Sequence, residues 1–368
     1  MKVIFAGGGT AGHVNPALAA ADYFAKRELC DISFAGGRGG IEEKLVGRAG
    51  YPIFSLPVSG LSRSISLEGL RKNAAALRNL GASMREAKRI VRAEKPDIVI
   101  GTGGYACYPM VAAAQSLGVK TALLEVNATP GVALKRLSRR ANLVMLAFEE
   151  TAHDIPNRNT VVTGNPVREG ILRCRERACE PIFPGGQPMV LSFWGSVGAF
   201  YMNKKMEGFI KLAAEKREFC HLHAAGAANY KWMPRELAEM GCDLSRADNI
   251  ELREYIYDME RAMACASLVI CRAGASTLAE ICAAGLPSII VPSPFVANNH
   301  QEKNARLLER AGAAVVLTED ECTPELLYKT ASELLASPER LHSMGEKARE
   351  KAHPDALERI YQAVKSVL

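Results

Sequence analysis

The residues best suited to chemistry lie between Leu268 and Asn304, where a short apolar run leads through a turn of small residues into a helical pattern. A helix N-terminus directly beyond a strand presents unpaired backbone N–H groups and the positive end of the helix dipole, which together suit a phosphate. Glu280 is expected on the first turn of this helix, where a carboxylate can accept from sugar hydroxyls, and Gln301 follows on the next helix. This combination indicates a nucleotide-sugar site rather than a site for phosphate alone.

Glu280 also has a purely structural interpretation. The helix is expected to begin near Ser276 or Thr277, and Thr277 and Glu280 have the spacing of a capping box, in which the glutamate satisfies a backbone N–H. Gly285 is expected to end the helix, and Pro287 prevents its continuation. Spacing alone leaves both interpretations of Glu280 open.

Three more glycine-rich turns follow predicted strands, at residues 7–13, 101–105 and 195–199. Open α/β sheets bind ligands at the carboxyl ends of their strands, so four such turns predict a shared cleft, although turn geometry alone explains any one of them. His13 stands at the tip of the first turn, beside the place of a phosphate or an acceptor hydroxyl. It is a candidate general base, with capping or packing as its structural alternative.

The first turn has a second interpretation, because Gly7, Gly9 and Gly12 match the G-x-G-x-x-G of dinucleotide-binding folds. That fingerprint needs an acidic residue at the end of the second strand, whereas here two glycines and Arg38 stand there. Arg38 suits a 2′-phosphate, so an NADP-dependent oxidoreductase is retained as an alternative. The chain contains no G-K-[ST] and hence no Walker A loop.

These turns need a framework of strands and helices to hold them. Short apolar runs alternate with helical patterns along the chain, which is typical of parallel, doubly wound sheets. Extended segments or strands are expected at residues 2–6, 31–35, 51–57, 98–101, 121–124, 143–147, 189–193, 219–224, 250–253, 268–271, 288–291 and 314–317. Helices are expected at 15–26, 41–49, 67–93 with a break at Gly81, 109–117, 203–215 and 354–367. A second series begins after residues 161–170, which predicts an α/β protein of two Rossmann-like doubly wound domains facing a cleft.

Composition sets the class of protein. A chain of 368 residues is long for one core and predicts about two domains, and its 48% hydrophobic and 23% charged residues are ordinary for a globular protein. It has no apolar run of about 18 residues. The glycines that follow its first few apolar residues indicate a strand rather than a signal peptide, so we expect the chain to remain in the cytoplasm.

The ten cysteines are scattered, without a CxxC, and several of them, including Cys265, Cys271 and Cys282, lie in apolar stretches. In a reducing compartment such residues are expected to be small buried hydrophobic side chains. His221 and His223 have no cysteine or acidic residue near them in the sequence, so no metal site is expected.

Basic residues crowd two segments of the N-terminal half, although the net charge is only +6. That net charge does not indicate nucleic acid, but it suits anionic lipid or phosphate. The first segment also carries apolar residues at helical spacing, and such a helix either lies on a membrane surface or packs its apolar face on a core. The basic residues are Arg63, Arg71, Lys72, Arg78, Arg85, Lys88, Arg89, Arg92 and Lys95, and then Lys135, Arg136, Arg139 and Arg140.

Seven motifs together carry a resemblance to a known family. In chain order they are GGGTAGHVNPALA, GTGGY, EVNATPG, VTGNPVR, FWGSVGA, CRAGASTLAEICAAGLP and PSPFVANNHQEKNA. They resemble glycosyltransferase family 28, and in particular the bacterial N-acetylglucosaminyltransferases that convert lipid I into lipid II in peptidoglycan synthesis. The similarity covers nearly the whole chain, and residues 271–304 with TGNPVR are its most specific parts.

The resemblance implies a GT-B fold, with an acceptor and membrane-facing domain at residues 1–162, a donor domain at 163–345 and a last helix at 346–368 that packs back on the first domain. It implies inverting transfer of N-acetylglucosamine from UDP-N-acetylglucosamine to the 4-hydroxyl of the muramoyl sugar of lipid I, which forms a β(1→4) bond. No metal and no cofactor are expected. The expected location is the cytoplasmic face of an anionic membrane, peripherally, with other cell-wall synthesis proteins as partners.

Site residues carry over from the family one by one. The candidate bases are His13 first and Glu125 second. Ile256 would bind uracil through its backbone, Glu280 the ribose hydroxyls and Arg168 the diphosphate. The acceptor's diphosphate would meet Gly9, Thr10, Gly12, His13, Gly103, Gly104 and Tyr105. UDP-N-acetylglucosamine would meet Thr10, Gly12, Asn127, Arg168, Ser196, Ile256, Ala275, Ser276, Thr277, Glu280, His300 and Gln301.

Three places depart from the family pattern. Ala11 and Trp194 each replace a frequent glycine, and residues 124–127 are Leu-Glu-Val-Asn where the family often has His-Glu-Gln-Asn. A role for that histidine is therefore excluded here, while Glu125 and Asn127 are retained. Besides the oxidoreductase, the alternatives are another UDP-sugar enzyme of this architecture, such as a hexose epimerase or a glycolipid synthase, and a nucleotide-sugar sensor without turnover.

Overall fold

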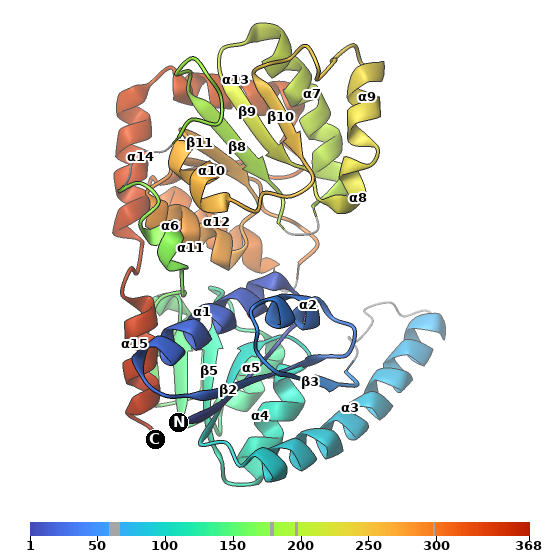
Figure 1. Cartoon of the computed structure of the whole chain (residues 1–368), viewed down its shortest axis with the longest axis vertical. Helices are drawn as coiled ribbons and strands as arrows, with labels where there is room; N and C mark the ends of the chain where they lie inside the picture. The colour runs from blue at the N-terminus through green and yellow to red at the C-terminus, as the bar shows by residue number, and fades with distance from the viewer. Residues whose placement is uncertain (59–66, 177–179, 196–197, 297–298) are drawn as a thin grey trace. The chain divides into compact units, whose positions relative to one another are not determined.

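The computed structural model describes residues 1–58, 67–176, 180–195, 198–296 and 299–368, and for residues 67–77 it describes the backbone alone. The chain divides into two compact units (Figure 1). The first unit consists of Met1–Pro166 and Asp355–Leu368, and the second is Val167–Pro354.

The first unit contains a seven-stranded sheet, parallel throughout, in the order β3-β2-β1-β4-β5-β6-β7. Its strands are β1 (Lys2–Gly7), β2 (Asp31–Gly37), β3 (Ile53–Leu56), β4 (Ile98–Gly103), β5 (Lys120–Glu125), β6 (Leu143–Leu146) and β7 (Thr160–Val162). Its helices are α1 (Ala11–Arg27), α2 (Ile41–Arg48), α3 (Leu67–Glu94), α4 (Cys107–Ser116), α5 (Val132–Ser138), the 3-10 turn η1 (Glu149–Asp154) and α15 (Ala356–Lys365).

Both faces of this first sheet are apolar, as expected for parallel strands covered by helices on two sides. Successive side chains of a strand point to opposite faces, so Ile4 and Phe5 of β1 enter different cores. Ile4 lies in one core with Ile90 of α3 and Leu134 of α5. Phe5 meets Phe24 of α1 on the other side, with ring centroids 5.9 Å apart.

The last helix, α15, packs on α1 within the first unit. The rings of Tyr361 and Phe24 meet edge to face, with centroids 5.3 Å apart and an interplanar angle of 77°, and Glu358 accepts from Arg27 at 2.5 Å. Ile360 is buried. The far end of the sequence therefore contributes to the core of the unit that the N-terminus begins.

The second unit contains a six-stranded parallel sheet in the order β10-β9-β8-β11-β12-β13. Its strands are β8 (Met189–Phe193), β9 (Cys220–Ala224), β10 (Ile250–Arg253), β11 (Leu268–Cys271), β12 (Ser288–Ile290) and β13 (Ala314–Val316). Its helices are α6 (Glu169–Leu172), α7 (Phe200–Lys216), α8 (Ala227–Tyr230), α9 (Met233–Glu239), α10 (Met259–Cys265), α11 (Ala275–Ala284), α12 (His300–Arg310), α13 (Pro324–Leu335) and α14 (Pro338–Glu350).

The second sheet separates two cores in the same way. Val190 and Leu268 lie in one core, and their chain neighbours Leu191 and Val269 lie in the other. Both faces are therefore buried, and the continuous apolar runs of β8 and β11 follow from this.

The prediction of two parallel, doubly wound sheets is confirmed, but several boundaries differ. Helix α1 begins at Ala11, four residues before the expected start, after a short turn in which Gly9 has a φ of +81°. His13 consequently lies in the first helical turn and not at the tip of a loop. Helix α3 continues through Gly81, since an exposed glycine weakens a helix by only about 1 kcal/mol. The short strand β7 was not expected.

Two of the three cysteines named from the sequence behave as predicted. Cys271 and Cys282 are buried free thiols, and burial raises the pKa of both. Cys265, in contrast, is disulfide-bonded, so the prediction of a buried free thiol was wrong for this residue.

Candidate functional site

Helix α11 begins four residues after β11 ends, at the carboxyl edge of the second sheet. Its N-cap is Gly274, in an extended conformation, so Ala275, Ser276 and Thr277 occupy the first turn. These three residues place backbone N–H groups and the positive end of the helix dipole just beyond the strand, an arrangement that suits an anion. Gly285 ends the helix in the left-handed conformation, with a φ of +61°, as the sequence predicts.

Glu280 stands on the second turn of α11 and forms an ion pair with Arg168. The Arg168 Nη2 atom lies 3.3 Å from the Glu280 Oε1 atom, and Arg168 is the N-cap residue of α6. Because Gly274 and not Thr277 is the N-cap of α11, Thr277 and Glu280 do not form a capping box. The capping interpretation of Glu280 was therefore wrong. The structure instead brings Glu280 together with Arg168, and both residues are predicted to bind the UDP-sugar.

The environment of Glu280 changes its acidity. Burial raises the pKa of this carboxyl, the charge and hydrogen bond of Arg168 act in the opposite direction, and the nearby charge of Glu260 adds to the rise. The net direction is upward.

Helix α12 is tied to the same edge of the sheet. The Gln301 Oε1 atom accepts from the Ser293 amide at 2.9 Å, and the buried Asn304 donates to the Ala273 carbonyl at 3.2 Å. His300 is the first residue of this helix. Gln301 and His300 therefore lie on a helix that is fixed to the turn after β11.

Arg272 is a residue whose role the sequence did not predict. Its Nη1 atom donates to the carbonyls of Val291 and Pro292, each at 3.1 Å, and its Nη2 atom pairs with Glu319 at 2.5 Å. Both charged side chains are about nine-tenths buried, at 10% exposure each. The guanidinium thus fixes the backbone after β12 to the end of β11, and its place beside the β11 turn was the signal available in the sequence.

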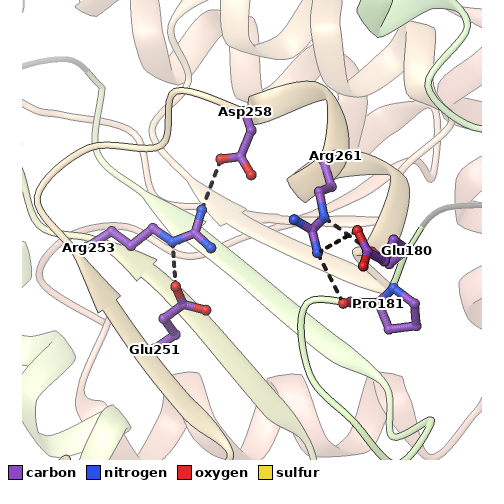
Figure 2. A network of polar contacts seen from close by, with 6 residues as sticks. All are labelled: Glu180, Pro181, Glu251, Arg253, Asp258 and Arg261. Carbon is purple, nitrogen blue, oxygen red and sulfur yellow. Dashed lines mark hydrogen bonds and ion pairs between the residues drawn. The ribbon is translucent and has the colours of Figure 1, made fainter.

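Ile256 lies in the loop between β10 and α10, which an arginine closes (Figure 2). Arg253 at the end of β10 donates to Glu251 at 2.6 Å and to Asp258, the N-cap residue of α10, at 2.9 Å. Ile256 is buried, and its neighbours Tyr255 and Tyr257 are exposed. The ion pair between Arg253 and Asp258 therefore joins the two ends of the loop that contains Ile256.

A second arginine in Figure 2 anchors α10 itself. Arg261 donates to the carbonyls of Glu180 and Pro181, each at 3.2 Å. It lies one turn beyond the loop, so the loop and the helix have separate arginine contacts. This separation provides a matched comparison for experiments on the Ile256 loop.

In the first unit, the turns after β1 and β4 meet. The Gly8 amide donates to the Gly103 carbonyl at 3.2 Å, and the Thr102 hydroxyl donates to the His13 carbonyl at 2.9 Å. A Cβ atom at Gly104 would lie 2.0 Å from the Gly8 carbonyl oxygen, so glycine is required for this close approach. The structure thus brings together the two glycine turns that the sequence assigns to one diphosphate.

Four more predicted residues lie at these turns. The His13 ring packs closely against Gly103, because a Cβ atom at Gly103 would lie 2.6 Å from His13 Nδ1. Tyr105 is exposed just beyond, and Thr10 is the N-cap residue of α1, followed by Gly12 in its first turn.

Glu125 ends β5 as a buried carboxylate whose two oxygens both accept. Its Oε1 atom accepts from the backbone and the side-chain amide of Asn127, at 3.0 and 3.2 Å, and its Oε2 atom accepts from the Gly131 amide at 3.0 Å. Burial raises the pKa of Glu125, while these hydrogen bonds act in the opposite direction. The geometry is that of a residue that shapes the loop at 126–131.

Ser196, which the sequence places near the donor, lies outside the described residues.

Both halves of the chain match domains of one known protein family. The N-terminal domain of glycosyltransferase family 28 matches residues 3–146, and the C-terminal domain of the same family matches residues 189–360. The chain is 40% identical to the UDP-N-acetylglucosamine--N-acetylmuramyl-(pentapeptide) pyrophosphoryl-undecaprenol N-acetylglucosamine transferase of Acetivibrio thermocellus, over 100% of this chain and 98% of that protein. It is 38% identical to the transferase of the same name from Listeria monocytogenes, over 100% of both chains.

Solved structures give the fold. The crystal structure of Acinetobacter baumannii MurG matches with a TM-score of 0.74 and 29% identity, over 99% of each chain. A UDP-GlcNAc 2-epimerase from Neisseria meningitidis matches with a TM-score of 0.68 at 14% identity, which shows a shared fold alone. The two parallel α/β sheets are thus those of the GT-B fold, as in MurG. With both domain models matched in order and full-length relatives at 38–40% identity, the chain belongs to glycosyltransferase family 28.

Proposed function

We propose that this chain transfers N-acetylglucosamine from UDP-N-acetylglucosamine to the 4-hydroxyl of the muramoyl sugar of lipid I, with inversion, to give lipid II. The observation that carries the proposal is the 40% identity, over 100% of the chain, to a transferase whose name states this donor and this acceptor. At 14% identity the epimerase shares only the fold, so it does not support an epimerase activity here.

The donor is bound by the second unit. The backbone amides of Ala275, Ser276 and Thr277 receive the diphosphate together with Arg168, and Glu280 accepts from the ribose hydroxyls. Positive charge at these places stabilises the UDP that departs, in place of a metal ion. The proposal is supported by the 3.3 Å approach of Arg168 to Glu280 beside the N-terminus of α11.

The remaining donor contacts follow from the family resemblance. The backbone of Ile256 binds uracil, Gln301 and His300 bind the transferred sugar, and Asn127 binds the donor's sugar from the loop that Glu125 shapes. Ser196 contributes near the diphosphate, and Thr10 and Gly12 near the donor. Support for Ile256 comes from the Arg253–Asp258 closure of its loop.

The acceptor is bound by the first unit. The turns containing Gly9 and Gly103 receive the diphosphate of lipid I, with Gly104, Tyr105, Thr10 and Gly12 at their edges. His13 removes the proton of the acceptor hydroxyl as the general base. Glu125 is the second candidate for that role, but both of its oxygens accept N–H donors in the structure, which favours His13.

The same unit binds the cytoplasmic face of an anionic membrane peripherally. The basic side chains of Arg85, Arg89 and Arg92 on α3, and Arg136 and Arg139 near α5, are exposed. No helix in the part of the chain that the structure describes combines the length and apolar character needed to cross a membrane. Arg63 and the side chains of Arg71 and Lys72, which belong to the first basic segment, lie outside what the structure describes, as do the side chains of the apolar residues Leu67, Leu70 and Leu77 in that segment.

The experiment that tests the function is UDP release from UDP-N-acetylglucosamine with and without a lipid I analogue. Release that depends on the analogue, together with a disaccharide product, is expected. Donor binding without such release would instead identify a nucleotide-sugar sensor. Sedimentation with vesicles of anionic lipid, compared with vesicles of zwitterionic lipid, tests the membrane proposal separately.

A further inference from the structure

Glu42 joins the ends of two neighbouring strands through one buried carboxylate. It is the second residue of α2 and is only 3% exposed. Its Oε2 atom accepts from the Gly9 amide at 3.1 Å, and its Oε1 atom accepts from the Gly37 amide at 2.7 Å. Gly9 follows β1 and Gly37 ends β2, so a single side chain connects the carboxyl ends of adjacent parallel strands.

Three glycines make room for this carboxylate. A Cβ atom at Gly8 would lie 2.2 Å from Glu42 Oε1, one at Gly36 would lie 2.4 Å from Glu42 Cγ, and one at Gly40 would lie 2.5 Å from the carboxylate. Glycine at these places is therefore explained by the space that Glu42 fills. The first glycine turn is shaped by a side chain 33 residues away in the sequence.

The chemistry requires a carboxylate and not merely a polar group. Each oxygen receives one backbone N–H, and Glu42 lies in the first turn of α2, where the helix dipole favours negative charge. A glutamine in the same place would turn its NH2 group toward one of the two amides and leave that buried N–H without an acceptor. On its other side the turn is held by the hydrogen bond from Gly8 to Gly103.

We propose that Glu42 is a positioning residue for acceptor binding. Its carboxylate holds the Gly8–Gly9 turn in the conformation that receives the diphosphate of lipid I. This rests on the proposed assignment of that turn to the acceptor. Because the Gly9 amide already donates to Glu42, it serves to fix the turn rather than to bind the phosphate directly. Loss of the contact therefore weakens acceptor binding without touching the donor groups of the second unit.

The test is steady-state kinetics of Glu42→Gln, with Glu43→Gln as the matched control. Glu43 is the next residue on α2, but it accepts from Ser55 on β3 and not from the glycine turn. Glu42→Gln is expected to raise the KM for a lipid I analogue about tenfold, the effect of losing one buried hydrogen bond, and to leave the KM for UDP-N-acetylglucosamine within about twofold. Hydrogen exchange at Gly9 and Gly37 should accelerate in the same variant, whereas Glu43→Gln should change neither measurement.

A second variant keeps the test decisive if Glu42→Gln does not fold. Gly40→Ala has an allowed backbone, with a φ of −75°, and its methyl group pushes the Glu42 carboxylate away without removing it. It should also raise the KM for the lipid I analogue. An unchanged KM for the analogue alongside faster exchange at Gly9 would overturn the proposal, because Glu42 would then only stabilise the fold. A raised KM for the donor alone would show instead that the turn does not belong to the acceptor, which is the failure of the proposed assignment.

Discussion

Arg168, the N-cap residue of α6, forms an ion pair with Glu280 on the second turn of α11, with 3.3 Å between the Arg168 Nη2 and Glu280 Oε1 atoms. The proposed function gives each of them a different partner in the donor, the diphosphate for Arg168 and the ribose for Glu280. Donor binding then exchanges one contact for two. Half of the Arg168 side chain is exposed, at 48%, so the ion pair itself adds only about 0–1 kcal/mol to the stability of the fold.

Glu280→Ala is expected to weaken UDP-N-acetylglucosamine binding about 10- to 100-fold, because hydrogen bonds with a charged partner contribute about 1.5–3 kcal/mol. The melting temperature should change little. Isothermal titration with UDP and with the UDP-sugar measures the loss. Glu169→Gln, next to Arg168, serves as the control and should bind the donor normally. Normal donor affinity in a destabilised Glu280→Ala protein would show that the residue only packs.

Arg253→Met tests the loop that presents Ile256. Without its two ion pairs the loop between β10 and α10 is no longer fixed, so the KM for UDP-N-acetylglucosamine should rise about five- to tenfold while kcat stays within about twofold. Arg261→Met removes an arginine that anchors α10 without touching the contacts that close the loop (Figure 2). Equal effects of the two substitutions would indicate a general loosening of α10 and would refute a specific role for Arg253.

His13→Ala tests the general base. Proton removal by a positioned side chain is worth about 10²–10⁴-fold, so kcat should fall by that factor while the KM for the donor is kept. The fold should survive, because Thr102 bonds the carbonyl of His13 and not its ring. Thr102→Val is the comparison, since it removes that bond and leaves the imidazole in place. If kcat of His13→Ala stayed near that of the unaltered protein, Glu125→Gln would be the next variant to measure.

Local sequence patterns predicted most of the strands and helices. Contacts between residues far apart in the sequence explain the features that were not predicted. Apolar runs gave the strands, and Gly285 ends α11 as its position indicates. Thr277 was misjudged because the N-cap depends on where the backbone leaves the strand, which spacing does not specify. Each of Glu42 and Arg272 has a distant partner, Gly9 at 33 residues and Glu319 at 47 residues, and no local spacing connects these pairs. Sequence motifs suggested the candidate ligand-binding residues, whereas no motif indicated Glu42 or Arg272, which fix the neighbouring turns.

From the sequence, His221 and His223 were considered only as metal ligands. In the structure their burial lowers their pKa values, which affects stability in acid. Both are fully buried on β9, where the Ser192 hydroxyl bridges them at 2.7 Å to each ring, and His223 also meets Asn203 at 3.0 Å. Burial lowers the pKa of His221 well below its usual value and lowers that of His223 to about 3.

Because the pKa values of His221 and His223 are lowered in the folded protein, its stability falls in acid. The unfolded chain takes up a proton on His223 near pH 6.5, while the folded chain does so only near pH 3, so protonation favours unfolding throughout that window. Stability is full above pH 6.5 and should fall by roughly 2 kcal/mol for each histidine between pH 7 and pH 5. Urea unfolding over this range measures the slope. His223→Gln should remove about half of it, and the exposed His342→Gln none. An unchanged slope in His223→Gln would mean that this ring takes up its proton at the same pH in the folded protein as in the unfolded chain.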